Sequence, residues 1–251
     1  MKCKLCLQEK DLLKRSHIIP NFMYKELFDE KHILVKIDLS TNKDDLVQSG
    51  EYEANILCKD CDNSILGGLE NYANNVLYGG NIKGISMVNE INKHNVSYTK
   101  CSGIDYKKFK LFLLSIIWRS SISSKNFYNF VDLGPYEEII RKMIIDNDPQ
   151  RQIDFPCIIC SYRHNKGLPY QVVSQPRKFR NNKGKTQYSI LIGGILYIFI
   201  IAQNYVDDVV KEAVINENGE IKILHIESDQ AGKILSRSFG EMDKNLFDQK
   251  S

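Results

Sequence analysis

Two pairs of cysteines, each separated by two residues, bracket the first part of the chain. Cys3 and Cys6 open this stretch, and Cys58 and Cys61 close it. Four thiolates are a ligand set that a structural zinc ion binds tetrahedrally. The alternative, four buried cysteines without a metal, requires the same spacing to arise twice by coincidence. We therefore predict a structural Zn²⁺ site formed by these four cysteines.

A histidine between the two pairs points to chemistry beside the metal. His17 follows Ser16 and precedes Ile18-Ile19-Pro20, and Asn55 comes shortly before the second pair. A neutral imidazole near its ordinary pKa accepts a proton from water at physiological pH. The alternative is a structural histidine that bonds a backbone carbonyl across a hairpin. We favour a general base, because His17 lies between two zinc knuckles.

In this pattern the chain resembles the HNH endonuclease family (His-Me finger nucleases). Zinc-stapled members carry C-x-x-C, a histidine followed by Ile-Ile-Pro or similar residues, an asparagine, and then C-x-x-C-His-Asn. The likeness covers about residues 3 to 75. It implies that His17 activates water for attack on a phosphodiester and that Asn55 fixes the loop carrying this histidine.

Two positions depart from the family pattern. Asp62 stands where the family usually has a histidine ligand to the catalytic cation, and Ser16 stands where many members have another ligand. Because a carboxylate suits Mg²⁺ or Mn²⁺, we expect Asp62 to bind the catalytic cation. Glu70 is a candidate for the missing ligand, although eight residues of regular helix would place it about 12 Å from Asp62. The alternative for Glu70 is an exposed acid on an amphipathic helix.

A third C-x-x-C pair, Cys157 and Cys160, has His164 nearby. The isoleucines between the two cysteines and the preceding Phe155 favour a strand, in which residues three apart point to opposite faces. A second zinc site would also need more ligands than these three residues. We therefore predict buried free thiols here.

Positive charge is concentrated outside the cysteine-bracketed stretch. Through residue 80 the chain has 10 Lys and Arg against 13 Asp and Glu, whereas the remainder has 24 against 18. The net charge of +3 is too small to establish a nucleic-acid partner. One segment does suggest phosphate binding at the tip of a hairpin, and the alternative is a solubilising loop. Its five cations are Arg177, Lys178, Arg180, Lys183 and Lys185.

Apolar periodicity and turn residues predict an α+β fold. We expect a treble-clef or ββα-metal zinc module in residues 1–80, followed by a helical and antiparallel-sheet domain in residues 81–251. The predicted helices cover residues 21–32, 62–77, 106–121 and 137–146. The predicted strands cover residues 33–37, 155–160, 170–174, 188–192, 196–202 and 221–224, with a loop at 41–50.

The leading hypothesis is a metal-dependent HNH-type endonuclease, which the resemblance associates with prokaryotic defence or mobile elements. The alternative is a catalytically inactive zinc-stabilised module that binds nucleic acid or protein. We expect a nucleic-acid partner, DNA in the first place, and leave open a second copy or another protein. The region 81–251 would bind nucleic acid, sense a ligand or form an oligomer. The absence of a signal peptide or an apolar run of spanning length predicts a cytoplasmic protein without a membrane partner.

Overall fold

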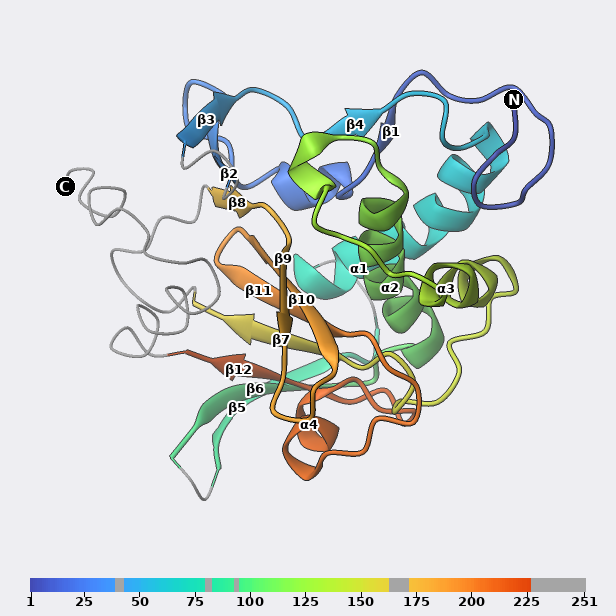
Figure 1. The fold of residues 1–251 in the computed structure, drawn as a ribbon. Coiled ribbons are helices and arrows are strands. Elements are labelled where there is room, and N and C mark those ends of the chain that lie inside the picture. The colour runs from blue at the N-terminus through green and yellow to red at the C-terminus, as the bar shows by residue number, and fades with distance from the viewer. Residues whose placement is uncertain (39–42, 80–82, 93–94, 163–171, 227–251) are drawn as a thin grey trace.

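The computed structural model of the chain describes residues 1–38, 43–79, 83–92, 95–162 and 172–226. Helices packed against one large mixed sheet confirm the predicted α+β class (Figure 1). Three longer helices lie together beside the sheet, and a short fourth helix lies near its far end. Their bounds are α1 (Gly67–Leu77), α2 (Tyr106–Ile122), α3 (Tyr136–Ile145) and α4 (Asp208–Ala213).

The described residues form one sheet of ten strands and a separate pair of two-residue strands. The small pair is β1 (Ser16–His17) with β4 (Tyr52–Glu53). The large sheet runs in the order β3 (Lys43–Val47), β2 (Leu34–Asp38), β8 (Val172–Ser174), β10 (Thr186–Ile192), β11 (Ile195–Ile200), β7 (Cys157–Ser161), β12 (Ile221–His225), β6 (Ser97–Ser102) and β5 (Ser86–Ile91), with β9 (Arg177–Arg180) also paired to β10.

The expectation of an antiparallel sheet is wrong at two places. Strand β2 pairs with β8 in parallel, and β7 pairs with β12 in parallel. Both pairs join segments that are distant in sequence, so no hairpin turn imposes an antiparallel direction on them. The sheet is therefore mixed.

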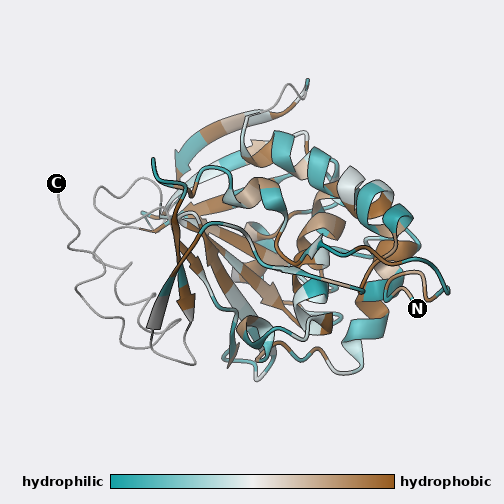
Figure 2. Ribbon diagram, turned by 90° about the horizontal axis from the view of Figure 1, so that it is seen from above, coloured by the Kyte–Doolittle hydropathy of each residue, from teal (hydrophilic) through white to brown (hydrophobic). Residues whose placement is uncertain are grey.

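Helix α2 occupies the centre of the protein. The Asp105 side chain caps its N-terminus by accepting a hydrogen bond from the backbone N–H of Lys108 at 3.0 Å. From Phe109 onward nearly every side chain is buried, because α2 contacts both α1 and α3 and also carries apolar side chains toward the sheet. Figure 2 shows this layering, with brown strands inside and teal on the outward turns of the helices.

Residues on both sides of position 80 share one hydrophobic core. Ile18 and Leu57 from the first segment belong to the same buried cluster as Leu114 and Ile190 from the second. Strand β2 of the first segment also pairs with β8 of the second. The boundary predicted at residue 80 therefore does not coincide with a division of this core.

Three local expectations need correction. The helix predicted at 21–32 is limited to one 3-10 turn, Asn21–Tyr24. The Asp29 carboxylate then accepts hydrogen bonds from the N–H groups of Lys31 and Ile33, which forms a turn in place of further helix.

The loop predicted at 41–50 contains strand β3, which pairs with β2. The basic segment, predicted as the tip of a hairpin, begins as strand β9, which pairs with β10.

Candidate functional site

The four N-terminal cysteines converge as predicted. Their Sγ atoms all lie within 4.8 Å of one another, and those of Cys6 and Cys58 are 4.0 Å apart. A tetrahedral zinc with bonds of about 2.3 Å needs sulfurs about 3.8 Å apart, so the cluster fits such an ion. The backbone N–H of Cys58 also donates to Cys3 Sγ at 3.4 Å. These four residues could hold a metal such as zinc.

Backbone pairing brings the two cysteine knuckles together. The N–H of Lys4 donates to the carbonyl of Ile56 at 2.9 Å, and Leu12 forms an isolated bridge with Cys58. The second knuckle continues into the π-helix η2 (Asp60–Leu66) and then into α1. The cysteine cluster therefore fixes the start of a helical segment, which carries Asp62 and Glu70 away from it.

His17 lies at the end of β1, where it pairs with Tyr52 of β4. The rings of these two residues meet edge to face with their centroids 6.4 Å apart. The His17 side chain is half-buried, and this burial lowers its pKa. The carboxylate of Glu70 opposes this shift, whereas Arg119 and Arg15 reinforce it. The imidazole is therefore held in its neutral form at physiological pH, as a general base requires.

Arg119, from the last turn of the buried helix α2, reaches the His17 segment. Its side chain is 1% exposed, and its Nη1 donates to the His17 carbonyl at 3.0 Å and to Glu70 Oε1 at 2.7 Å. Its remaining nitrogens donate to the Ser115 carbonyl and hydroxyl. We did not predict this residue from the sequence; its only signal was a lone guanidinium in an apolar helix.

A polar groove lies beside this arginine and has a volume of about 380 Å³. Both Asp62 and Glu70 line it, so the two acids predicted to be far apart share one depression. The two acids come from consecutive helical segments, Asp62 from the π-helix and Glu70 from the first turn of α1. The remaining lining residues are Asn21, Phe22, Asn63, Gly67, Asn71 and Asn74.

Ser16 and Asp62 are linked electrostatically at this groove. Burial raises the pKa of Asp62, while the Arg119 charge and the Ser16 hydroxyl oppose the rise. Ser16 is fully buried, and its Oγ has no hydrogen bond of normal geometry to any described residue. The Ser16 hydroxyl is therefore close enough to stabilise the ionised form of Asp62, and it can still form a further hydrogen bond.

Asn55 contacts the segment that leads to His17 through its backbone. The residue is exposed, has a left-handed φ of 62°, and donates its backbone N–H to the Leu13 carbonyl at 2.9 Å. Its side chain makes no hydrogen bond to any residue that the structure describes. Asn55 thus joins the turn before the second knuckle to the segment that leads to His17, and Arg119 contacts the His17 carbonyl itself.

The cysteines of β7 lie apart from the N-terminal cluster. Cys157 packs into the main core and Cys160 into a smaller hydrophobic cluster, consistent with opposite faces of the sheet. Burial raises the pKa of each thiol to about 12. The prediction of buried free thiols is confirmed for these two residues, while His164 lies outside the described residues.

The basic segment 177–185 is remote from His17. Figure 1 shows the turn between β9 and β10 near α4, at the other end of the protein from β1 and β4. Lys183 pairs with Asp207 at 3.1 Å, and Arg180 donates to the Gly184 carbonyl at 2.9 Å. Lys178 and Lys185 are exposed, whereas Arg177 is half-buried. The structure does not bring this segment to the groove.

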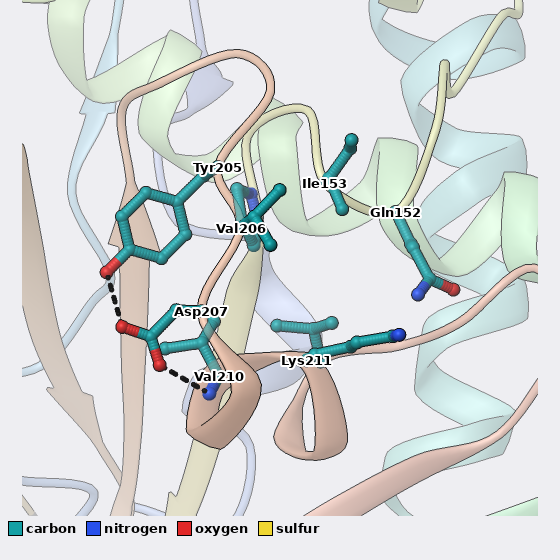
Figure 3. A pocket seen from close by; sticks show the side chains of 9 residues that line it. Gln152, Ile153, Tyr205, Val206, Asp207, Val210 and Lys211 are labelled. Carbon is teal, nitrogen blue, oxygen red and sulfur yellow. Dashed lines mark hydrogen bonds between the residues drawn. The ribbon is translucent and has the colours of Figure 1, made fainter.

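A second depression, near α4, is too small for a substrate (Figure 3). Its volume is about 20 Å³, close to that of a single water probe, and valine, isoleucine and proline side chains contribute much of its lining. The groove beside Arg119 is therefore the better candidate site. No helix among the described residues has the length and apolar character needed to cross a membrane.

Comparison of the chain with protein-family models, curated proteins and solved structures finds no match.

Proposed function

We propose that the protein is a metal-dependent HNH-type endonuclease that hydrolyses phosphodiester bonds of nucleic acid. The observation that carries this proposal is the half-buried His17, whose backbone carbonyl is joined through Arg119 to the Glu70 carboxylate beside the groove. The four cysteines, which fit a zinc ion, support the further proposal that the module around them is a treble clef.

In this proposal His17 takes a proton from the attacking water. Its lowered pKa keeps a nitrogen lone pair available at neutral pH. Arg119 donates a hydrogen bond to Oε1 of Glu70, so Oε2 remains available for other interactions at the groove. Asp62, with the unused Ser16 hydroxyl close to it, supplies the second carboxylate.

These two carboxylates suit Mg²⁺ or Mn²⁺, because Mg²⁺ often binds one or two protein carboxylates together with substrate phosphate and water. A bound cation would stabilise the negative charge that develops on the phosphate and the leaving oxygen. The zinc cluster would serve a different purpose, since four thiolates leave a zinc ion no open position for a substrate.

Nuclease assays with a matched variant test this proposal. Plasmid DNA and RNA would be incubated with the full chain and Mg²⁺ or Mn²⁺, beside His17→Ala. We expect cleavage by the wild type and a loss of at least about 100-fold in the variant. Zinc content and thermal unfolding would establish that His17→Ala remains folded. Cleavage that survives the substitution would contradict the role of His17.

One observation favours a second function, a zinc-stabilised binding module without activity. Among the described residues, the cysteines alone form a group of three or more metal-ligating side chains; Asp62, Glu70 and His17 do not form another. The same assay separates the two functions. Nucleic-acid binding without cleavage under either cation would support the binding module.

A further inference from the structure

An exposed cationic cluster lies directly beside His17. The guanidinium of Arg15 stands over the Tyr52 ring, 4.0 Å from its centroid, and the Lys125 ammonium is 5.9 Å from the same centroid. Tyr52 pairs in register with His17, and the two rings touch edge to face. We call Arg15, Tyr52 and Lys125 the Tyr52 cluster.

The two cations of this cluster are available to an external anion. Arg15 and Lys125 are both exposed, and neither forms an ion pair with any described residue. The neighbouring acid Glu53 is buried, and its carboxylate is occupied by hydrogen bonds from Ser123 and Ser124. No local carboxylate therefore neutralises the pair among the residues described.

The aromatic ring holds the two charges in position. A cation near the face of a tyrosine ring is attracted by the ring quadrupole, which reduces the conformational freedom of a long side chain. Because Arg15 already covers the Tyr52 ring, this ring is poorly placed to stack on a nucleobase. Phosphate, which pairs well with guanidinium and ammonium groups, is the ligand that the Tyr52 cluster fits best.

We propose that Arg15 and Lys125, held at Tyr52, bind the phosphate backbone of nucleic acid and present it to His17. This inference rests on the proposed nuclease function and names the surface by which the substrate approaches. The basic segment 177–185 lies at the other end of the protein from β1 and β4, and Lys183 there is paired with Asp207. Contacts to phosphates carry no direct sequence information, so binding at the cluster is insensitive to base sequence.

Two charge-matched double variants test the proposal. Arg15→Gln/Lys125→Gln removes one arginine and one lysine from the Tyr52 cluster, and Lys178→Gln/Arg180→Gln removes the same pair of residue types from β9. Both would be made in full-length His17→Ala protein, which prevents cleavage. Binding of a fluorescent DNA duplex, a single-stranded DNA and an RNA would be measured at several salt concentrations.

We expect the cluster variant to weaken binding on the order of tenfold and to reduce the salt dependence by about one to two counterions. The β9 variant should have the smaller effect, and duplexes of unrelated sequence should respond alike. Unchanged binding and salt slope in the cluster variant would overturn the proposal, as would an equal or larger loss in the β9 variant. Thermal unfolding would verify that both variants are folded.

The outcomes also separate this inference from the proposed function. If binding depends on Arg15 and Lys125 but the wild-type protein cleaves no nucleic acid, the binding surface is supported and the nuclease function is rejected. The cluster substitutions would also be made in protein that retains His17. If this variant cleaves as well as the wild type, the nuclease function is supported and the binding surface is rejected. Absence of both binding and cleavage would reject both.

Discussion

The ionisation of His17 depends on charges from three elements. Burial lowers its pKa; Glu70 on α1 opposes that change, whereas Arg119 on α2 and Arg15, next to β1, favour it. If neutral His17 is the base, cleavage falls as the pH drops through this lowered pKa and is insensitive to pH above it. We expect the acidic limb of the profile below the ordinary histidine value of 6.5.

Two substitutions should move that limb in opposite directions. Glu70→Gln removes the charge that favours protonation, so the limb moves to lower pH; Arg15→Gln removes a charge that disfavours it, so the limb moves to higher pH. Profiles of kcat/KM, which report the free enzyme, would measure both shifts when each is normalised to its own maximum. Movement in the same direction would contradict this account of His17.

Arg119 is expected to act on catalysis through position. Arg119→Met removes the donor to the His17 carbonyl and leaves Glu70 without its partner. Because small displacements of a base are costly, we expect kcat to fall about 100-fold, with a smaller change in KM. Arg119→Lys, which keeps a donor and the charge, should recover part of kcat.

Arg141→Met is the matched control for this prediction. Arg141 also lies on a helix beyond residue 80 and donates to a backbone carbonyl of the cysteine knuckle, that of Leu5. Like Arg119 it does not line the groove, but unlike Arg119 it does not contact His17. Equal losses of kcat in Arg119→Met and Arg141→Met, with equal loss of thermal stability, would show that Arg119 serves only general packing.

The residues of the site differ in how far the sequence could predict them. The cysteines could be predicted because their ligand type and spacing are local properties. Arg119 could not, because its partner His17 is 102 positions away and the surrounding helix has the pattern of ordinary core. The side-chain role given to Asn55 came from resemblance, whereas its contact with Leu13 depends on backbone geometry.

At the level of elements, strand β7 separates its two thiols. Cys157→Ala/Cys160→Ala should leave the zinc content near one per chain, because these side chains belong to different hydrophobic clusters. Loss of their buried sulfurs should lower the free energy of unfolding by about 1–3 kcal/mol. Metal analysis and denaturant unfolding would measure both effects.

Cys58→Ala/Cys61→Ala is the corresponding variant of the N-terminal cluster and should lose the metal. Structural zinc contributes directly to folding, so this variant should also be much less stable than the β7 variant. Loss of zinc from the β7 variant, or retention of it by the Cys58/Cys61 variant, would contradict the assignment of the cluster.

Most helices and strands could be predicted from their own residues, but the order of the strands could not. Helix α2 follows from a continuous apolar stretch with Asp105 as its cap. The parallel pairing of β2 with β8 joins residues more than 130 positions apart, and no local pattern encodes it. The helix expected after Pro20 failed for a local reason, the turn that Asp29 makes.

For the molecule as a whole, the first 80 residues are integrated with the rest. The Lys4 ammonium donates to the Ile122 carbonyl at 2.7 Å, Arg119 to that of His17, and Glu53 accepts from Ser123 and Ser124. A fragment of residues 1–80 would expose the apolar face that α2 covers. We therefore expect this fragment, supplied with zinc, to lack cooperative thermal unfolding and His17-dependent cleavage.

The full chain would be the control, and we expect it to unfold in one cooperative transition, followed by circular dichroism. A zinc-loaded fragment that melts cooperatively and cleaves nucleic acid would show that the shared core is dispensable for the site.

The π-helix Asp60–Leu66 makes the groove sensitive to chain length. Cys61 belongs to the cysteine cluster at one end, and Glu70 is paired with Arg119 at the other. Each residue of regular helix turns the backbone by about 100°, so removing one between these anchors would rotate one acid away from the groove. We therefore expect an insertion or deletion here to disturb the site more than the exchange of a side chain. The number of residues in this stretch is itself a part of the site.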